Sequence, residues 1–272
     1  MELAIGFFIA FAIAVTGVGA GTITAPLLIL LLHVPIELSV GTALAYSAIV
    51  KMLVVPVQIW RKKVVYRVVG WMLLGGLPGV ILGVLLFHRV VRNGEQNILY
   101  VALGSIIVAS SAWHLYRNVR PSKAGQAKKS HRAWIAALML PIGAEVGFSS
   151  SGAGSLGTLA LLSLTSLDAS QVVGTDLVFG LCLSAVGGGM HVFAGNFSSA
   201  LLVKLVTGGV FGALMGSMIA PKVPNRQLRV ALAVLLLVVG TLFCIRPFNS
   251  HPIASVQTVV HASTATGGYI IR

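Results

Sequence analysis

Long runs without a charged residue limit this chain to membrane structures. From Leu3 to Leu32 there are 30 uncharged positions, more than the ~20 apolar residues that one helix needs to cross a bilayer. In hydrocarbon every backbone amide needs a partner within the protein, which favours helices. The sequence therefore predicts an all-α polytopic membrane protein of about eight transmembrane segments, near residues 3–32, 38–60, 68–87, 97–116, 133–164, 172–194, 200–220 and 228–245.

Composition excludes several classes of function. Hydrophobic residues fill 57% of the 272 positions and charged residues only 9%, which does not fit a soluble domain. The net charge of +13 lies in short segments between apolar runs, as topology signals do, and not on a nucleic-acid surface. Cys182 and Cys244 lack metal-ligand spacing. We expect no metal, no cofactor and no nucleic-acid partner. The expected partners are a small anionic solute and membrane lipid, and a homodimer is left open.

The sequence repeats itself, without gaps, at an offset of 133 residues. The positions that coincide are chemically unusual in spans: Gly19, Gly21, Gly41, Thr42, Gly75, Gly76, Gly79 and Gly83 match Gly152, Gly154, Gly174, Thr175, Gly208, Gly209, Gly212 and Gly216. We infer two homologous four-segment repeats, residues 1–116 and 133–246, joined by a basic cytoplasmic linker, 117–132, and followed by a polar mobile tail, 247–272. Such duplication is typical of secondary transporters, whose site lies between the halves.

The relative orientation of the repeats stays open at this point. If all eight segments cross once, the repeats are parallel. If the overlong first and fifth segments are re-entrant hairpins, each half crosses three times and the repeats are inverted. With Lys51 set aside, both arrangements place 13 basic residues inside and 5 outside, so the positive-inside rule does not choose between them.

Two related glycine runs interrupt the first and fifth segments, at residues 16–22 and 149–155. A glycine within a helix costs roughly 1 kcal/mol against alanine, so the runs predict broken helices that face a cavity, with Pro26 as a second interruption. Free amides at a restarted helix attract anions. The alternative is simple close packing of helices. The expected substrate contacts are Thr16, Gly19, Gly21, Thr22, Ser151, Gly152, Gly154 and Ser155.

Further candidates are polar residues within spans. Lys51 lies mid-span, where a charge costs on the order of 2.5 to 3.5 kcal/mol; it either contacts an anionic substrate or forms a structural ion pair with Asp176 or Glu145. Asp176, His191 and Glu145 are candidates for proton coupling or ion pairing. The hydroxyls of Thr42 and Thr175 are expected anion ligands. The later glycines, at positions 75 to 83 and 208 to 216, recur every three or four residues and are assigned to helix packing.

These features together resemble the TauE/SafE family of sulfite exporters. The resemblance rests on the duplicated glycine-rich opening, on Val40-Gly41-Thr42 and Val173-Gly174-Thr175-Asp176, on Lys51, and on His191 followed by Gly195-Asn196. It covers nearly the whole chain and implies transport of small anions, especially sulfite and organosulfonates, across the bacterial inner membrane. Gln58 stands where the second repeat has His191, so a role that needs two related histidines is not expected.

We therefore expect a multi-pass secondary transporter that exports a small anion (sulfite, sulfonate or a related oxyanion), and not an enzyme. A channel-like anion uniporter is the near alternative, with Asp176 and His191 then structural. An intramembrane serine hydrolase, with Ser151 as nucleophile and His191 as base, is a distant third because the duplication has no place in it.

Overall fold

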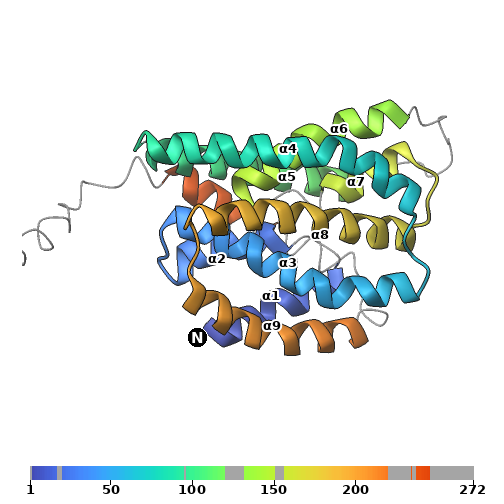
Figure 1. Ribbon diagram of the computed structural model, residues 1–272, viewed down its shortest axis with the longest axis horizontal. Coiled ribbons are helices and arrows are strands. Elements are labelled where there is room, and N and C mark those ends of the chain that lie inside the picture. Colours follow the sequence, from blue (N-terminus) through green and yellow to red (C-terminus); the bar gives the residue numbers. More distant parts are fainter. Residues whose placement is uncertain are drawn as a thin grey trace, which may run out of the picture.

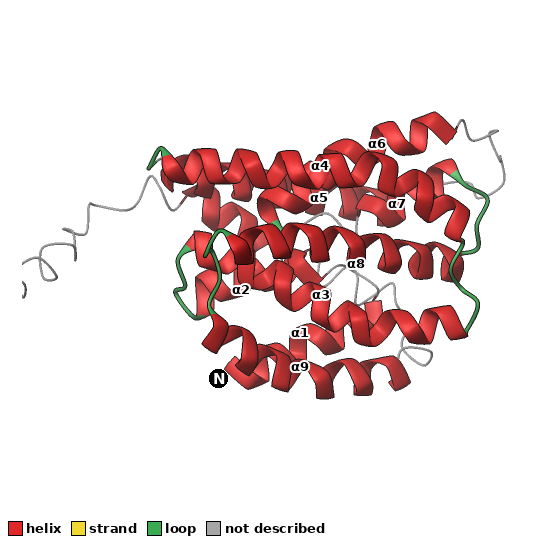
Figure 2. Cartoon of the chain, viewed as in Figure 1, coloured by secondary structure: helices red, strands yellow, loops and turns green. Residues whose placement is uncertain are grey.

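A computed structural model describes residues 2–16, 20–94, 96–119, 132–150, 156–219, 234 and 237–245. Over these residues the secondary structure is entirely helical, joined by short turns (Figures 1 and 2). The helices are α1 (Glu2–Thr16), α2 (Ala20–Leu31), α3 (Ile36–Trp60), α4 (Tyr66–Arg92), α5 (Gln96–Val119), α6 (Arg132–Ser149), α7 (Leu156–Leu164), α8 (Ala169–Phe193) and α9 (Ser199–Ile219). Residues 237–245 are also helical.

Four of the described helices, α3, α4, α8 and α9, are long and apolar enough to cross a membrane. Shorter apolar helical stretches cover residues 2–15, 97–112 and 134–149. Large apolar side chains lie exposed on the outside, with Phe193 94% and Trp60 85% accessible. An apolar exterior of this kind suits a lipid environment, so the all-helical membrane class predicted from the sequence agrees with the structure.

Helix boundaries recur at the offset found in the sequence. Helix α3 spans 36–60 and α8 spans 169–193; α4 begins at 66 and α9 at 199. The ends of α1 and α6, and those of α2 and α7, obey the same relation. Each equivalent pair of these boundaries differs by 133 residues.

The expected interruption at Pro26 is wrong. Helix α2 continues through this residue, and α3, α4 and α6 likewise contain Pro56, Pro78 and Pro141. Neighbouring helices and local adjustment satisfy the backbone groups that proline frees within a membrane protein. The predicted break near Gly19 falls on residues 17–19, which lie outside the described part of the chain.

Helices α3 and α8 lie side by side through the centre of the bundle and run in opposite directions (Figure 1). Gly41, near the start of α3, lies against the carbonyl of Asn196, just beyond α8. Gly174, near the start of α8, lies against the carbonyl of Lys63, just beyond α3. Both contacts leave no room for a Cβ atom. The two equivalent helices are therefore antiparallel.

The later glycine series packs helices from opposite halves, as predicted. On α9, Gly208, Gly212 and Gly216 lie against the backbone of Leu3, Phe7 and Phe11 on α1, and on α4, Gly75, Gly79 and Gly83 lie against that of Ala136, Leu140 and Ala144 on α6. The two sets of contacts are related, position by position, by the offset of 133. Small residues of this kind let helix backbones approach closely.

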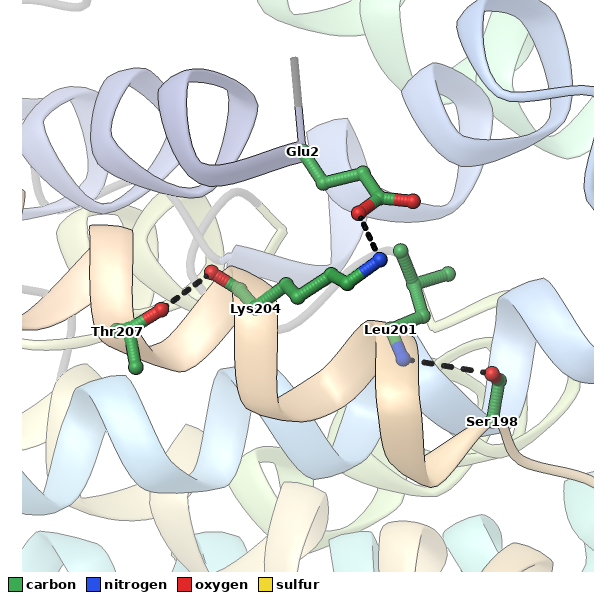
Figure 3. Close-up of polar contacts among 5 residues, drawn as sticks. All are labelled: Glu2, Ser198, Leu201, Lys204 and Thr207. Atoms are coloured by element: carbon green, nitrogen blue, oxygen red, sulfur yellow. Dashed lines mark hydrogen bonds and ion pairs between the residues drawn. The ribbon is translucent and has the colours of Figure 1, made fainter.

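Helix α1 starts, and helix α2 ends, at the same end of the bundle. Glu2 at the start of α1 forms a 2.8 Å ion pair with Lys204 near the start of α9 (Figure 3). Gly41 near the start of α3 contacts Asn196, three residues before α9 begins, so α1, α3 and α9 all start at one end. We call this the α3-start end. Since α2 leads directly into α3, the α1–α2 pair returns to the end from which it came.

Candidate functional site

The Lys51 ammonium group lies at the crossing of α3 and α8. Its Nζ donates hydrogen bonds to the carbonyl of Gly180 (3.1 Å) and to Oγ of Ser184 (3.0 Å), both on α8. The Oγ atoms of Ser184 and Ser47 are 3.2 Å apart. Lys51 is only 2% exposed. An ammonium has three donors, so the two hydrogen bonds leave one N–H for a further acceptor.

The described residues contain no ion pair with Lys51 within 4.0 Å, but the Asp176 carboxylate interacts electrostatically with its ammonium group. The ion pair they contain is Lys204–Glu2, at the surface. The structural ion pair with Asp176 or Glu145, which the sequence left open, is thus not formed within 4.0 Å in the part of the chain described. Burying a charge is costly, and an anion in direct contact with the ammonium would lower that cost further than Asp176 does at longer range.

The residues of this cluster occupy equivalent positions in the two halves of the chain. Lys51 and Ser184 are 133 positions apart, and so are Ser47 and Gly180. Because α3 and α8 are antiparallel, equivalent residues meet at the midpoint of their crossing. The same position therefore supplies an ammonium from one half and a hydroxyl from the other, which makes the centre chemically asymmetric.

Asp176 is buried on α8 at the side of α7. Its Oδ2 accepts a 2.8 Å hydrogen bond from Oγ1 of Thr158, and Oδ1 lies against the Cα of Gly157, with no room for a Cβ atom. At about 100° per residue, Asp176, Gly180 and Ser184 share one face of α8, and Asp176 lies about 12 Å along the helix from Ser184. The carboxylate belongs to the same polar face as the partners of Lys51.

The two threonines expected as anion ligands tie down loops in the structure. Thr42 Oγ1 accepts a hydrogen bond from the backbone N–H of Ser198 (3.0 Å), and Thr175 Oγ1 accepts one from Val65 (3.1 Å). The two threonines are 133 positions apart, and so are the two amides that donate to them. A threonine of each half thus forms a hydrogen bond to a loop of the other half. A role in substrate contact stays a prediction for both residues.

His191 is buried at the α3-start end of α8 and pairs with a residue that the sequence did not single out. Its Nε2 lies 3.2 Å from the carbonyl oxygen of Gly147 on α6, and its ring lies 5.0 Å from that of His88 on α4. The sequence signals neither His88 nor Thr158. Ser184 could have been found, since it is the equivalent of Lys51 at the offset of 133.

Glu145 lies apart from this cluster, in a cavity of about 770 Å³ between α4, α5, α6 and α7. The lining is apolar except for Glu145 and Ser110. Carboxylate oxygen Oε1 of Glu145 is buried and has no hydrogen-bond partner among the described residues. The structure does not bring Glu145 to Lys51.

The glycine-run candidates are only partly described. Thr16 ends α1, and Gly21 and Thr22 belong to the first turn of α2. Gly19, Ser151, Gly152, Gly154 and Ser155 lie outside the described residues. The anion contacts expected from these runs, and the serine nucleophile of the hydrolase alternative, stay predictions.

Comparison with known proteins decides the family. The model of the family described as sulfite exporter TauE/SafE matches residues 2–243. The chain belongs to the TauE/SafE family. As a TauE/SafE protein it is a multi-pass membrane transporter. It is also 30% identical, over 244 residues, to the probable membrane transporter protein YjnA of Bacillus subtilis (strain 168). That match covers 86% of this chain and 95% of the relative. No solved structure matches this TauE/SafE protein significantly.

Proposed function

We propose that this TauE/SafE protein is a secondary transporter that exports a small anion, such as sulfite or a sulfonate, across the bacterial inner membrane. The observation that supports this most strongly is the Lys51 ammonium, which is buried at the crossing of α3 and α8 and donates its hydrogen bonds in the described part of the chain to uncharged groups of Gly180 and Ser184. Its remaining N–H and the one serine O–H that the hydrogen bond between Ser47 and Ser184 does not use form a compact set of donors. Such donors suit an oxyanion.

We further propose that the chain consists of two inverted repeats, each with a re-entrant first segment and three crossings. The antiparallel α3–α8 pair and the common starting end of α1 and α3 support this arrangement. The basic residues of loop 61–67, linker 117–132 and the segment after α9 then lie on one side, which is cytoplasmic by the positive-inside rule. The α3-start end, with His191, faces outward.

This arrangement suits alternating access around a fixed central site. Inverted repeats exchange conformations when the protein opens to the other side of the membrane. The contacts of α1 with α9, and of α4 with α6, join the two halves along two seams of glycine contacts. An anion at Lys51 would lie between these seams, at the crossing of α3 and α8, where one half would rotate against the other during alternating access.

The experiment that tests this function is sulfite flux into proteoliposomes that contain the full chain. Lys51→Met removes the ammonium and keeps an unbranched side chain, and it should abolish most of the flux. Lys204→Met, which removes an exposed lysine, is the matched control and should leave flux unchanged. Wild-type protein that moves no more sulfite than empty vesicles would refute the proposal. Flux that does not respond to an imposed pH gradient would favour a channel-like uniporter.

A further inference from the structure

Two imidazole rings from opposite halves of the chain meet near the α3-start end. His88 lies in the last turns of α4 and His191 in the last turn of α8. The ring centroids are 5.0 Å apart, with an angle of 67° between the planes. The positions equivalent to His88 and His191 carry Pro221 and Gln58. The pair is therefore a feature of this interface and not a product of the duplication.

Some ring nitrogens of the two histidines form no hydrogen bond with the described residues. Nε2 of His191 contacts the carbonyl of Gly147, but its Nδ1 and the Nε2 of His88 are buried without a hydrogen-bond partner among the described residues. Leaving such a buried group unpaired is costly in a folded protein. Two orphan nitrogens on neighbouring rings indicate that the site binds something that these atoms can hold, and a proton is the smallest candidate.

Apolar side chains enclose the pair. The Phe87 ring lies 5.1 Å from that of His191, and the Phe148 ring lies 5.7 Å from Phe87. His191 is fully buried, whereas His88 is half-buried. His88 is thus the member of the pair that a proton from outside would reach first, and His191 is the inner member.

The pair shares a helix face with the Lys51 site. At about 100° per residue, His191 falls within the same arc of α8, about 80° wide, as Asp176, Gly180 and Ser184. His191 lies about 10 Å along the helix from Ser184. A negative charge at Lys51 is therefore close enough to favour a positive charge on the pair.

Other charged groups stand on the elements packed around the histidines. They are Arg89 and Arg92 on α4, Glu145 on α6, Glu37 and Lys51 on α3, and Asp176 on α8 itself. In the described part of the chain, none of them forms an ion pair with His88 or His191. Across about 10 Å of helix, the Lys51 ammonium would disfavour a proton on the pair, and a singly charged anion bound at Lys51 would cancel that effect.

We propose that His88 and His191 together form the proton-binding site that couples proton movement to anion transport. The neutral pair accepts one proton on a ring nitrogen when an anion occupies the Lys51 site, and it releases the same proton on the side where the anion leaves. Proton and anion therefore cross the membrane in the same direction, and during export the outward anion gradient drives both. Only an N–H bond forms and breaks. At about 10 Å and an effective dielectric constant near 20, a single negative charge raises the proton affinity of the pair on the order of tenfold. The inference rests on the proposed anion transport and identifies its coupling ion.

The test is proton uptake on addition of sulfite to the purified full chain in weakly buffered solution, followed with a pH-indicator dye. Wild-type protein should take up protons as sulfite binds. His191→Gln, which copies the residue at the equivalent position 58, and His88→Gln should each reduce the uptake at least fivefold. His33→Gln replaces an exposed histidine at the same end and should retain the proton uptake.

Sulfite flux in proteoliposomes separates the outcomes. Net flux driven by a pH gradient should fall further in both pair variants than sulfite-for-sulfite exchange, which needs no net proton movement. Wild-type flux together with unchanged proton uptake in both variants would overturn the histidine assignment and leave the transport function standing. Absence of wild-type flux would refute the transport function itself, and the coupling role with it.

Discussion

Moving the buried lysine from α3 to α8 is a stringent test of the central site. Lys51 Nζ and Ser184 Oγ are 3.0 Å apart, and the two positions are equivalent in the two halves. The double variant Lys51→Ser/Ser184→Lys exchanges their side chains. Because α3 and α8 are antiparallel, the lysine moved to position 184 should reach the carbonyl of Ser47, as Lys51 now reaches that of Gly180. We expect the exchanged protein to transport sulfite.

The expected magnitudes follow from the geometry. An ammonium and an anion about 4 Å apart attract by about 4 kcal/mol at an effective dielectric constant near 20. Since each 1.4 kcal/mol is a factor of ten, Lys51→Ser alone should raise the KM for sulfite by up to about 1000-fold. Ser184 keeps Ser47 as a hydrogen-bond partner in that variant, so the protein should still fold. The exchange should restore the KM to within about tenfold of wild type.

The assay is initial sulfite uptake into proteoliposomes over a range of concentrations. The elution volume and melting temperature of each detergent-purified variant serve as folding controls. Ser184→Lys alone places two ammonium groups together and should impair both folding and transport. If the exchanged protein is folded but transports no better than Lys51→Ser, the equivalence of the two positions at the site is refuted.

Three further predictions concern the contacts between the halves. Gly79→Ala should lower stability by about 1–3 kcal/mol because the added Cβ would meet the α6 backbone. The control Gly70→Ala, in open space on the same helix, should raise stability by up to about 1 kcal/mol. Equal melting temperatures of the two variants in detergent would contradict this packing. Thr42→Val and Thr175→Val should each cost about 1–3 kcal/mol, since each leaves a loop amide without its acceptor, and faster amide hydrogen exchange at residues 198 and 65 is the measurement. Glu2→Gln removes an exposed ion pair and should change stability by less than about 1 kcal/mol; a larger loss on thermal unfolding would show that the pair matters more than its exposure implies.

Much of the fold is visible in the sequence because membrane helices are local structures. Apolar run length, and the need to satisfy each amide within hydrocarbon, fix where helices such as α3 and α8 lie. The offset of 133 residues in glycine positions reappears in helix boundaries, and the later glycines occupy the packing seams that their spacing predicted. Pro26 misled because proline is tolerated within membrane helices.

The site was less accessible to sequence reasoning. Lys51 stands out because a charge in a span is rare and costly, but its partners Gly180 and Ser184 follow only from the antiparallel packing of α8. His88 carries no signal of its own, since one histidine near a helix end is ordinary. Its significance comes from the ring of His191, which lies 103 residues away in sequence and 5.0 Å away in space.

The sequence by itself determined the membrane class, the helix positions and the rare buried charge, because each depends on the local chemistry of a segment in lipid; the duplication stays a prediction from the spacing of the glycines. Only the tertiary structure decided that α3 and α8 run in opposite directions, since loop charges count the same in either orientation. Contacts between distant segments depend on how whole helix surfaces fit together. That fit places Lys51 opposite Ser184, and His88 against His191.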